Sequence, residues 1–305
     1  MLPDESRAVI EEIVDPIFNV ADIQVFLKRE DLIHDEIPGN KWRKLKYNLE
    51  EAKRREHTKI LTYGGAFSNH IAAVAAAGKV YGFQTIGIIR GEELNGNNPT
   101  LTKASDDGMS LHFVSRSDYR QKNSQEFMAD LVDQFGEFYE IPEGGTNHRA
   151  VKGCQEILDS CQGFDVICSP VGTGGTIAGL ILSAGSGQNV LGFPALKGDF
   201  INGELEELLE NFGECPQSQW SLMTNYHFGG YAKYTTELIK FINRFKKEHV
   251  IQLDPIYTAK MMMGIYDLIK KGYFKQGTKI LAIHTGGQQG IQGFNFLNGG
   301  LIDFE

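Results

Sequence analysis

The sequence predicts an α/β protein with mainly parallel sheets, and three features of its 305 residues lead to this prediction. Short apolar runs alternate with helical patterns from one end of the chain to the other. The runs are apolar at neighbouring positions, as in parallel strands that are buried on both faces. The length suits about two domains that share one cleft. In such sheets, ligands bind beyond the carboxyl ends of the strands, where loops lead into helices.

The individual elements follow from these patterns in chain order. The predicted strands are residues 59–63, 85–89, 111–114, 165–169, 190–193 and 279–284. The predicted helices are residues 68–81, 119–135, 147–161, 176–184, 235–248 and 259–271. This alternation favours parallel sheets that are covered by helices.

Composition excludes several classes of function. A net charge of −9 argues against a nucleic-acid partner, because a basic face is not expected to outweigh it. The N-terminus is acidic and no apolar run approaches about 18 residues, so we expect no signal sequence, no membrane span and a cytoplasmic location. The histidines lack zinc-type spacing, so no metal site is predicted. The four cysteines form no C-x-x-C pair and are expected to be buried packing residues, namely Cys154, Cys161, Cys168 and Cys215.

Lys41 stands in the most informative segment, residues 38–45. Pro38 and Gly39 interrupt the chain, and Lys41 then opens a predicted helix. In the first turn, the positive end of the helix dipole disfavours an ammonium ion and lowers its pKa. A neutral amine is what Schiff-base chemistry requires. The alternative interpretation is a surface lysine in a basic helix.

Two loops that follow predicted strands have the composition of anion sites. After residues 59–63, two glycines lead to Ser68 and Asn69 at a helix start, where N–H groups, a hydroxyl and an amide would suit a carboxylate. An ordinary N-cap is the alternative there. After residues 165–169, the loop consists of Gly172, Thr173, Gly174, Gly175 and Thr176. Its small residues let backbone amides approach one phosphate group, while a plain glycine-rich turn is the alternative.

A third strand end carries Thr285, whose hydroxyl would point into the same cleft. The segment before the predicted helix at 259–271 contains a proline and Tyr257. Four features together suggest pyridoxal phosphate as a cofactor. They are a lysine at a helix start, a loop that can bind one phosphate group, a site for a carboxylate and a hydroxyl that faces the cleft.

The motifs GNKxRKL, SNH, GTGGT, DPxYT and HTGG occur in this order and span essentially the whole chain. In this respect the sequence resembles the fold-type-II pyridoxal-phosphate enzymes of the D-cysteine desulfhydrase and 1-aminocyclopropane-1-carboxylate deaminase family. The resemblance implies a fold like that of the tryptophan synthase β chain, with two open twisted α/β domains. It implies a larger domain from residues 1–45 and 151–305, beginning with a strand at 26–32. The smaller domain would be residues 46–150.

The resemblance also implies the roles of individual residues. Lys41 would be the Schiff-base lysine, and Lys44 would contact the phosphate together with Gly172–Thr176. Asn69 would bind the 3′-oxygen of the cofactor, and Ser68 and His70 would flank the substrate carboxylate. Tyr226 and Tyr257 would be the two tyrosines of the active site. The expected cofactor is pyridoxal 5′-phosphate, the expected substrate a small amino acid, and the expected assembly a homodimer.

The resemblance leaves two reactions to be separated. The deaminases of this family place Glu after the second tyrosine and Leu after the last histidine, where this chain has Thr258 and Thr285. A neutral hydroxyl near the pyridine nitrogen makes a weaker electron sink, which suffices for β-elimination. His70, where deaminases carry Gln, favours the same choice.

We therefore expect a lyase that carries out β-elimination on a small amino acid such as D-cysteine and releases pyruvate, ammonia and sulfide, an activity that could also be classed with hydrolases. The first alternative is 1-aminocyclopropane-1-carboxylate deaminase, and the second is a non-catalytic cofactor-binding protein. Several positions depart from the family pattern and could reshape the substrate pocket, namely Pro38, Trp42, Ala72 and residues 228–234.

Overall fold

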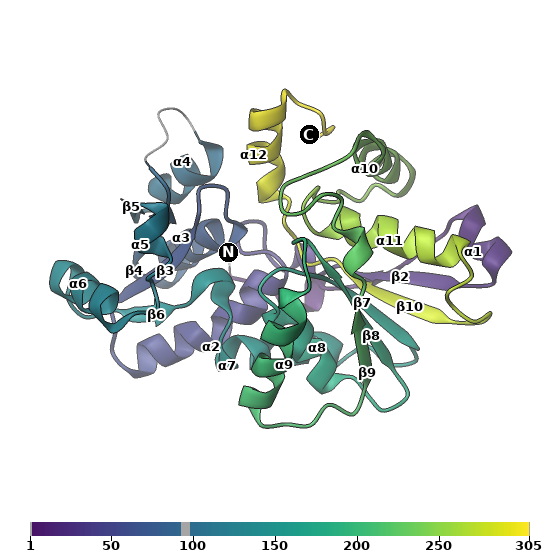
Figure 1. Ribbon diagram of the computed structural model, residues 1–305, viewed down its shortest axis with the longest axis horizontal. Coiled ribbons are helices and arrows are strands. Elements are labelled where there is room, and N and C mark those ends of the chain that lie inside the picture. Colours follow the sequence, from purple (N-terminus) through teal and green to yellow (C-terminus); the bar gives the residue numbers. More distant parts are fainter. Residues whose placement is uncertain (1, 93–97, 305) are drawn as a thin grey trace.

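The computed structural model describes residues 2–92 and 98–304, and it confirms the mixed α/β class with mostly parallel sheets (Figure 1). The larger sheet has the strand order β1 (Ile10–Ile13), β2 (Gln24–Lys28), β10 (Lys279–Ile283), β7 (Val166–Val171), β8 (Asn189–Pro194) and β9 (Gln219–Leu222). The smaller sheet has the order β5 (Met109–Val114), β4 (Gln84–Arg90), β3 (Lys59–Gly65) and β6 (Tyr139–Ile141). Neighbouring strands are parallel in both sheets, except that β1 runs antiparallel to β2 at one edge.

Helices cover both faces of the larger sheet (Figure 1). On one face lie α1 (Pro16–Ala21), α10 (Thr236–His249), α11 (Thr258–Lys270) and α12 (Gln289–Asn298). On the other face lie α7 (His148–Gln155), α8 (Gly175–Ser183) and α9 (Phe200–Phe212). Because both faces are covered, a central strand such as β7 is buried at every residue, which explains why its sequence is apolar apart from Ser169.

The smaller sheet is covered in the same way. One face packs against α2 (Asn40–Arg54), α3 (Asn69–Tyr81) and α4 (Pro99–Asp106), and the other against α5 (Arg116–Tyr119) and α6 (Gln125–Phe135). The alanines of α3 let it pack closely, and its residues from His70 to Gly78 are all buried. Helix α12 of the larger sheet contacts α3 and α4, where Gln289 Nε2 donates to Thr100 Oγ1 at 2.8 Å. Helix α12 thus connects the helices of the larger sheet with those of the smaller sheet.

Helix α2 is anchored by a buried ion pair. The guanidinium of Arg43 donates to both carboxylate oxygens of Glu30, at 2.8 and 3.0 Å, and both side chains are buried. Arg43 also pairs with Glu5 near the N-terminus. These contacts hold the helix that carries Lys41 and Lys44 against the N-terminal segment.

Most predicted elements agree with the structure to within two residues at each end, and three depart further. The strand predicted at residues 26–32 ends at Lys28, because the charged residues that follow form the 3₁₀ turn η2 (Glu30–Leu32) and its ion pairs. The helix predicted at residues 119–135 begins only at Gln125, as α6, because the hydroxyl of Ser124 caps it by accepting from Phe127 N, whereas Tyr119 ends the separate short helix α5. The helix predicted at 147–161 ends at Gln155 and continues as the 3₁₀ turn η4 (Glu156–Leu158).

Other elements were not predicted, among them β1, β6, β9, α1, α4, α9 and α12. The cysteine prediction is correct for three residues, since Cys154, Cys161 and Cys168 are buried, but it is wrong for Cys215, which is exposed. Within residues 2–92 and 98–304, no helix has the length and apolar character needed to cross a membrane.

Candidate active site

The segment before Lys41 packs directly on the loop that follows β10. Gly39 has φ +59°, and an added Cβ there would lie only 2.3 Å from the carbonyl oxygen of Thr285. A side chain at this position would therefore collide with the backbone, so glycine is required both for conformation and for space. Lys41 follows in the first turn of α2, as the sequence predicted.

Burial and, to a smaller extent, the nearby ammonium of Lys44 together lower the pKa of Lys41 to about 7, while Cys154 and Asp254 oppose the change. The direction agrees with the sequence prediction, but desolvation rather than the helix dipole is the main cause. Lys41 Nζ lies 3.4 Å from Asn40 Oδ1. About half of this amine is therefore neutral near pH 7, and a nucleophilic lysine needs this neutral form.

Lys44 lies about one helical turn further on and contacts two segments, the one between β6 and α7 and the one between β7 and α8. Its Nζ donates to the carbonyl oxygen of Gly144 at 2.9 Å and to the hydroxyls of Thr146 and Thr173 at 3.1 and 3.3 Å. Burial lowers the pKa of Lys44 to about 8, so most Lys44 side chains are still protonated and charged at pH 7. The buried cation of Lys44 and the hydroxyls of Thr146 and Thr173, which precede α7 and α8, form a suitable site for a phosphate group.

The glycines of this loop keep the site open. Gly174 adopts φ +81° as the N-cap of α8, and an added Cβ at Gly175 would lie 2.9 Å from Thr146 Oγ1 and 3.2 Å from Lys44 Nζ. The hydroxyl of Thr176 accepts from Asn40 Nδ2 at 2.8 Å. The loop Gly172–Thr176 is therefore tied to the same turn of α2 that carries Lys41.

Ser68 and Asn69 lie where β3 leads into α3. The hydroxyl of Ser68 accepts from His70 N and Ile71 N at 3.2 and 3.3 Å, so it is an N-cap of the ordinary kind. The Oδ1 atom of Asn69 is buried and has no hydrogen-bond partner within the described residues. An unpaired buried amide oxygen is costly in a finished structure, which indicates that this side chain faces a ligand.

The imidazole of His70 is buried and neutral. Thr62 Oγ1 donates to the carbonyl oxygen of Ile141 at 2.8 Å, so Nε2 of His70, 2.9 Å away, must donate to Thr62. Nδ1 then carries the lone pair, and it has no partner among the described residues. Burial and the ammonium groups of Lys41 and Lys44 hold the pKa of His70 well below its usual range.

Asp254, which the sequence did not single out, organises the start of α11. Its carboxylate accepts from the backbone N–H groups of Ile256, Tyr257 and Thr258 at 2.8–2.9 Å, and from the hydroxyl of Thr258 at 2.7 Å. Thr258 Oγ1 also accepts from Asp254 N at 2.8 Å. The only proton of this hydroxyl is therefore committed to Asp254. Thr285, in contrast, is buried, with 7% of its surface exposed, and its side chain makes no hydrogen bond to another described residue.

Tyr257 lies against the phosphate-type loop. An added Cβ at Gly172 would lie 3.4 Å from the hydroxyl of Tyr257. Burial raises the pKa of Tyr257 well above its usual range, and the neighbouring Tyr231 and Asp254 raise it further, so the hydroxyl stays protonated. The ring centroids of Tyr231 and Tyr257 are 6.2 Å apart at an edge-on angle of 68°.

Tyr226 does not join this group. Its hydroxyl donates to Asp267 Oδ2 at 2.7 Å, more than two turns along α11 from Thr258, and its ring packs near Phe193 in the core. The tyrosine that the structure brings to Tyr257 is Tyr231. The sequence did indicate this region, since Tyr231 lies in the segment 228–234 that departs from the family pattern. Only the course of the loop before α10 decides which of the two tyrosines lies next to Tyr257.

The residues on these loops fit pyridoxal phosphate. The lysine with a depressed pKa suits covalent attachment of the aldehyde, and Lys44 with the Gly172–Thr176 loop suits the phosphate. The unpaired amide of Asn69 suits a polar ring substituent. No other cluster in the described residues combines these three features.

Comparisons with known proteins agree with this fit. The family model described as "Pyridoxal-phosphate dependent enzyme" matches residues 14–286. A protein of Pyrococcus abyssi that is provisionally named 1-aminocyclopropane-1-carboxylate deaminase is 31% identical, over 88% of this chain and 86% of its own. A mitochondrial protein of Arabidopsis thaliana, named as a bifunctional D-cysteine desulfhydrase and 1-aminocyclopropane-1-carboxylate deaminase, is 28% identical over 88% of this chain and 73% of its own. A crystal structure described as an ACC deaminase homologue superposes with a TM-score of 0.83 at 28% identity, covering 99% of this chain and 97% of that chain.

These comparisons correct one expectation. The class of hydrolase is wrong, because the relatives are named for deaminase and desulfhydrase activities, and these belong to lyase chemistry. The fold, the fitted cofactor site and the similarities over most of the chain all lead to one assignment. The chain belongs to the pyridoxal-phosphate-dependent enzymes of fold type II, among the lyases related to 1-aminocyclopropane-1-carboxylate deaminase and D-cysteine desulfhydrase.

Proposed function

We propose that the chain catalyses β-elimination from D-cysteine, with uptake of water and release of pyruvate, ammonia and sulfide. One observation carries the choice of reaction. Thr285 offers a neutral hydroxyl without a hydrogen-bond partner at the end of β10, where deaminases of the family have leucine, and Thr258 stands where they have glutamate. The chain thus lacks the carboxylate that would favour a protonated pyridine ring.

Bound pyridoxal phosphate supplies an electron sink for the substrate's α-carbon, and its strength depends on the charge at the ring nitrogen. A neutral hydroxyl beside that nitrogen leaves the ring unprotonated and the sink weak. Loss of an α-proton followed by departure of a thiolate needs no more than this. Opening of a cyclopropane ring, in a substrate that has no α-hydrogen, needs a stronger sink.

The residues of the site can divide the remaining work. Lys41, with a pKa of about 7, exchanges protons near neutral pH and is suited to remove the α-proton. Tyr257 stays protonated and is suited to donate a hydrogen bond to the leaving sulfur. Ser68 and the N–H groups at the start of α3 are suited to bind the substrate carboxylate. Lys44 would hold the phosphate.

The second candidate is 1-aminocyclopropane-1-carboxylate deaminase. The names of the relatives favour it, since the Pyrococcus abyssi protein carries only this name and the Arabidopsis thaliana protein carries both. The site chemistry favours D-cysteine instead, and we give more weight to the site because one side chain at the ring nitrogen changes the reaction.

A substrate panel tests the proposal. Purified protein with its cofactor is incubated with D- and L-cysteine, D- and L-serine, β-chloroalanine and 1-aminocyclopropane-1-carboxylate, and keto-acid release is measured. The proposal predicts pyruvate from D-cysteine. Release of 2-oxobutanoate as the main product would establish the second candidate. A yellow protein that is inert toward every compound would establish the non-catalytic interpretation.

Three further expectations stay predictions. They are the division into residues 1–45 with 151–305 and residues 46–150, the homodimer, and the cytoplasmic location. The roles given above to Lys41, Ser68 and Tyr257 are likewise proposals, and Tyr231 takes the place of Tyr226 among them.

A further inference from the structure

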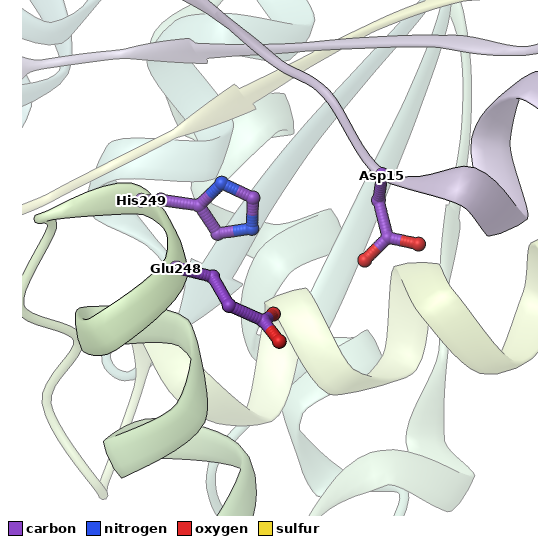
Figure 2. Close-up of side chains that lie close together, drawn as sticks. All are labelled: Asp15, Glu248 and His249. Atoms are coloured by element: carbon purple, nitrogen blue, oxygen red, sulfur yellow. The ribbon is translucent and has the colours of Figure 1, made fainter.

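Three possible metal ligands lie close together on the face of the larger sheet that α1, α10 and α11 cover, away from the active site. Figure 2 shows Asp15 at the start of α1 and Glu248 with His249 at the end of α10. One ligand atom from each residue lies within 4.8 Å of the others. Because β1 is antiparallel to β2, Asp15 lies near the amino ends of the parallel strands, opposite to the loops that carry Lys41.

His249 supplies the observation that points to a ligand. Its Nε2 atom is buried and has no hydrogen-bond partner within residues 2–92 and 98–304. Figure 2 shows the imidazole turned toward the two carboxylates. The ring of Phe245 packs against it at a centroid distance of 4.5 Å and limits its rotation. Buried polar atoms are normally hydrogen-bonded, and this nitrogen lies near two carboxylates without a bond to either, so a bound ligand would supply the missing partner.

Asp15 is held in a fixed orientation. Its Oδ1 accepts from Ile17 N at 2.8 Å, and its Oδ2 accepts from the hydroxyl of Tyr266 at 3.1 Å. Each carboxylate oxygen keeps a further lone pair for another partner. Hydrogen bonds of this kind orient carboxylates that bind metals in other proteins.

The two carboxylates favour a cation at this point, although Lys246 and Lys247 in the last turn of α10 are basic and Arg244 competes directly for Glu248. Glu248 and His249 end α10, so the helix dipole adds negative potential at this point. Arg244 is the competitor, since its Nε lies 3.5 Å from Glu248 Oε2. Both side chains are about half exposed, at 48% and 47%, so this ion pair is weak and leaves the other oxygen of Glu248 free.

We propose that Asp15, Glu248 and His249 bind one divalent cation of the zinc type. One imidazole and two carboxylates suit Zn²⁺, whereas Mg²⁺ and Ca²⁺ prefer oxygen ligands alone. Ligand atoms around tetrahedral Zn²⁺ at about 2.0 Å are about 3.3 Å apart, so small side-chain movements complete the site. The cation would join the segment before α1 to the end of α10 and stabilise the fold without entering the reaction.

The test uses the enzyme with its cofactor after treatment with a chelator. Titration with Zn²⁺ should show one tight site per chain and raise the melting temperature by a few degrees at saturation, while Mg²⁺ at the same concentration should not. His249→Gln should weaken Zn²⁺ binding by about 100-fold. Tyr266→Phe, which removes only the hydrogen bond to Asp15, should weaken it by about 10-fold.

The matched control is His112→Gln. His112 is also half-buried and packs against a phenylalanine, Phe135, at a centroid distance of 4.4 Å, but it belongs to no ligand cluster in the described residues. This variant should bind Zn²⁺ like the parent enzyme. Should His249→Gln fail to fold, Glu248→Gln serves instead, because Glu248 is exposed. Absence of a stoichiometric site, or equal Zn²⁺ affinity in the parent, His249→Gln and Glu248→Gln, would overturn the proposal.

Discussion

The hydroxyl of Thr258 donates a 2.7 Å hydrogen bond to the buried carboxylate of Asp254, and the same hydroxyl oxygen accepts from Asp254 N at 2.8 Å. The sequence had suggested that Thr258 and Thr285 both face the cofactor ring. The structure separates them: Thr258 serves the start of α11, and only Thr285 keeps an unused hydroxyl. The two threonines should therefore respond differently to the same substitution.

Thr258→Val should destabilise the protein by about 1–3 kcal/mol, because a buried carboxylate loses a donor that nothing replaces. Thr285→Val, which removes a hydroxyl without a partner, should change stability by less than about 0.5 kcal/mol and lower the rate with D-cysteine instead. Urea unfolding and pyruvate release measure the two effects. If Thr285→Val unfolded the protein while Thr258→Val affected only the rate, the roles assigned here would be reversed.

Lys41→Ala should remove the visible absorption band of the covalently attached cofactor and should stop turnover. In the parent enzyme, borohydride should make this covalent attachment permanent. The exposed Lys53 on the same helix provides the control, and Lys53→Ala should leave both unchanged. An active Lys41→Ala enzyme would contradict the assignment.

The depressed pKa of Lys41 gives a separate prediction for cofactor uptake. A neutral amine attacks an aldehyde and an ammonium ion does not, so uptake should accelerate as pH rises through about 7 and then level off. Stopped-flow absorbance of cofactor-free protein mixed with pyridoxal phosphate measures this. A rate that kept rising toward pH 10, as for an ordinary lysine with a pKa of about 10.4, would show that Lys41 is not desolvated.

Gly175→Ala should weaken cofactor affinity much more than it lowers the rate of fully loaded enzyme. The added Cβ would lie 2.9 Å from Thr146 Oγ1 and 3.2 Å from Lys44 Nζ and would push apart the groups around the phosphate. Gly203→Ala, in helix α9 where no atom lies within 4 Å of an added Cβ, is the control. Equal cofactor affinity in both variants would mean that the Gly172–Thr176 loop is only a turn.

Glu30→Gln should destabilise the protein by about 3–5 kcal/mol, because the guanidinium of Arg43 stays buried after its partner loses its charge. Glu50→Gln, at an exposed position of α2, should have little effect. Urea unfolding compares the two. A stability loss below about 1 kcal/mol in Glu30→Gln would contradict this, because Glu5 and Glu156 would then satisfy Arg43 without Glu30.

The sequence was sufficient where function depends on a local pattern. Lys41 in the first turn of α2 and the Gly172–Thr176 loop after β7 can be read from a few neighbouring residues, since glycine, proline and strand patterns mark loop and helix starts. The parallel sheets follow from apolar runs such as β7 for the same reason.

The sequence was insufficient where packing decides. Tyr226 and Tyr231 are five positions apart in one loop, and the bond from Tyr226 to Asp267 on α11 decides which of them reaches Tyr257. Asp254 looks like an ordinary turn residue until its carboxylate accepts four hydrogen bonds. The Asp15, Glu248 and His249 cluster joins opposite ends of the chain, so no ligand spacing could indicate it.

The most direct test of the account is keto-acid release by the unmodified protein from D-cysteine and from 1-aminocyclopropane-1-carboxylate, measured side by side with saturating cofactor. The neutral hydroxyl of Thr285, and the absence of glutamate at position 258, predict pyruvate and sulfide from D-cysteine and no 2-oxobutanoate from the cyclopropane substrate. Efficient release of 2-oxobutanoate would contradict the account, because the weaker electron sink would then have carried out the more demanding reaction.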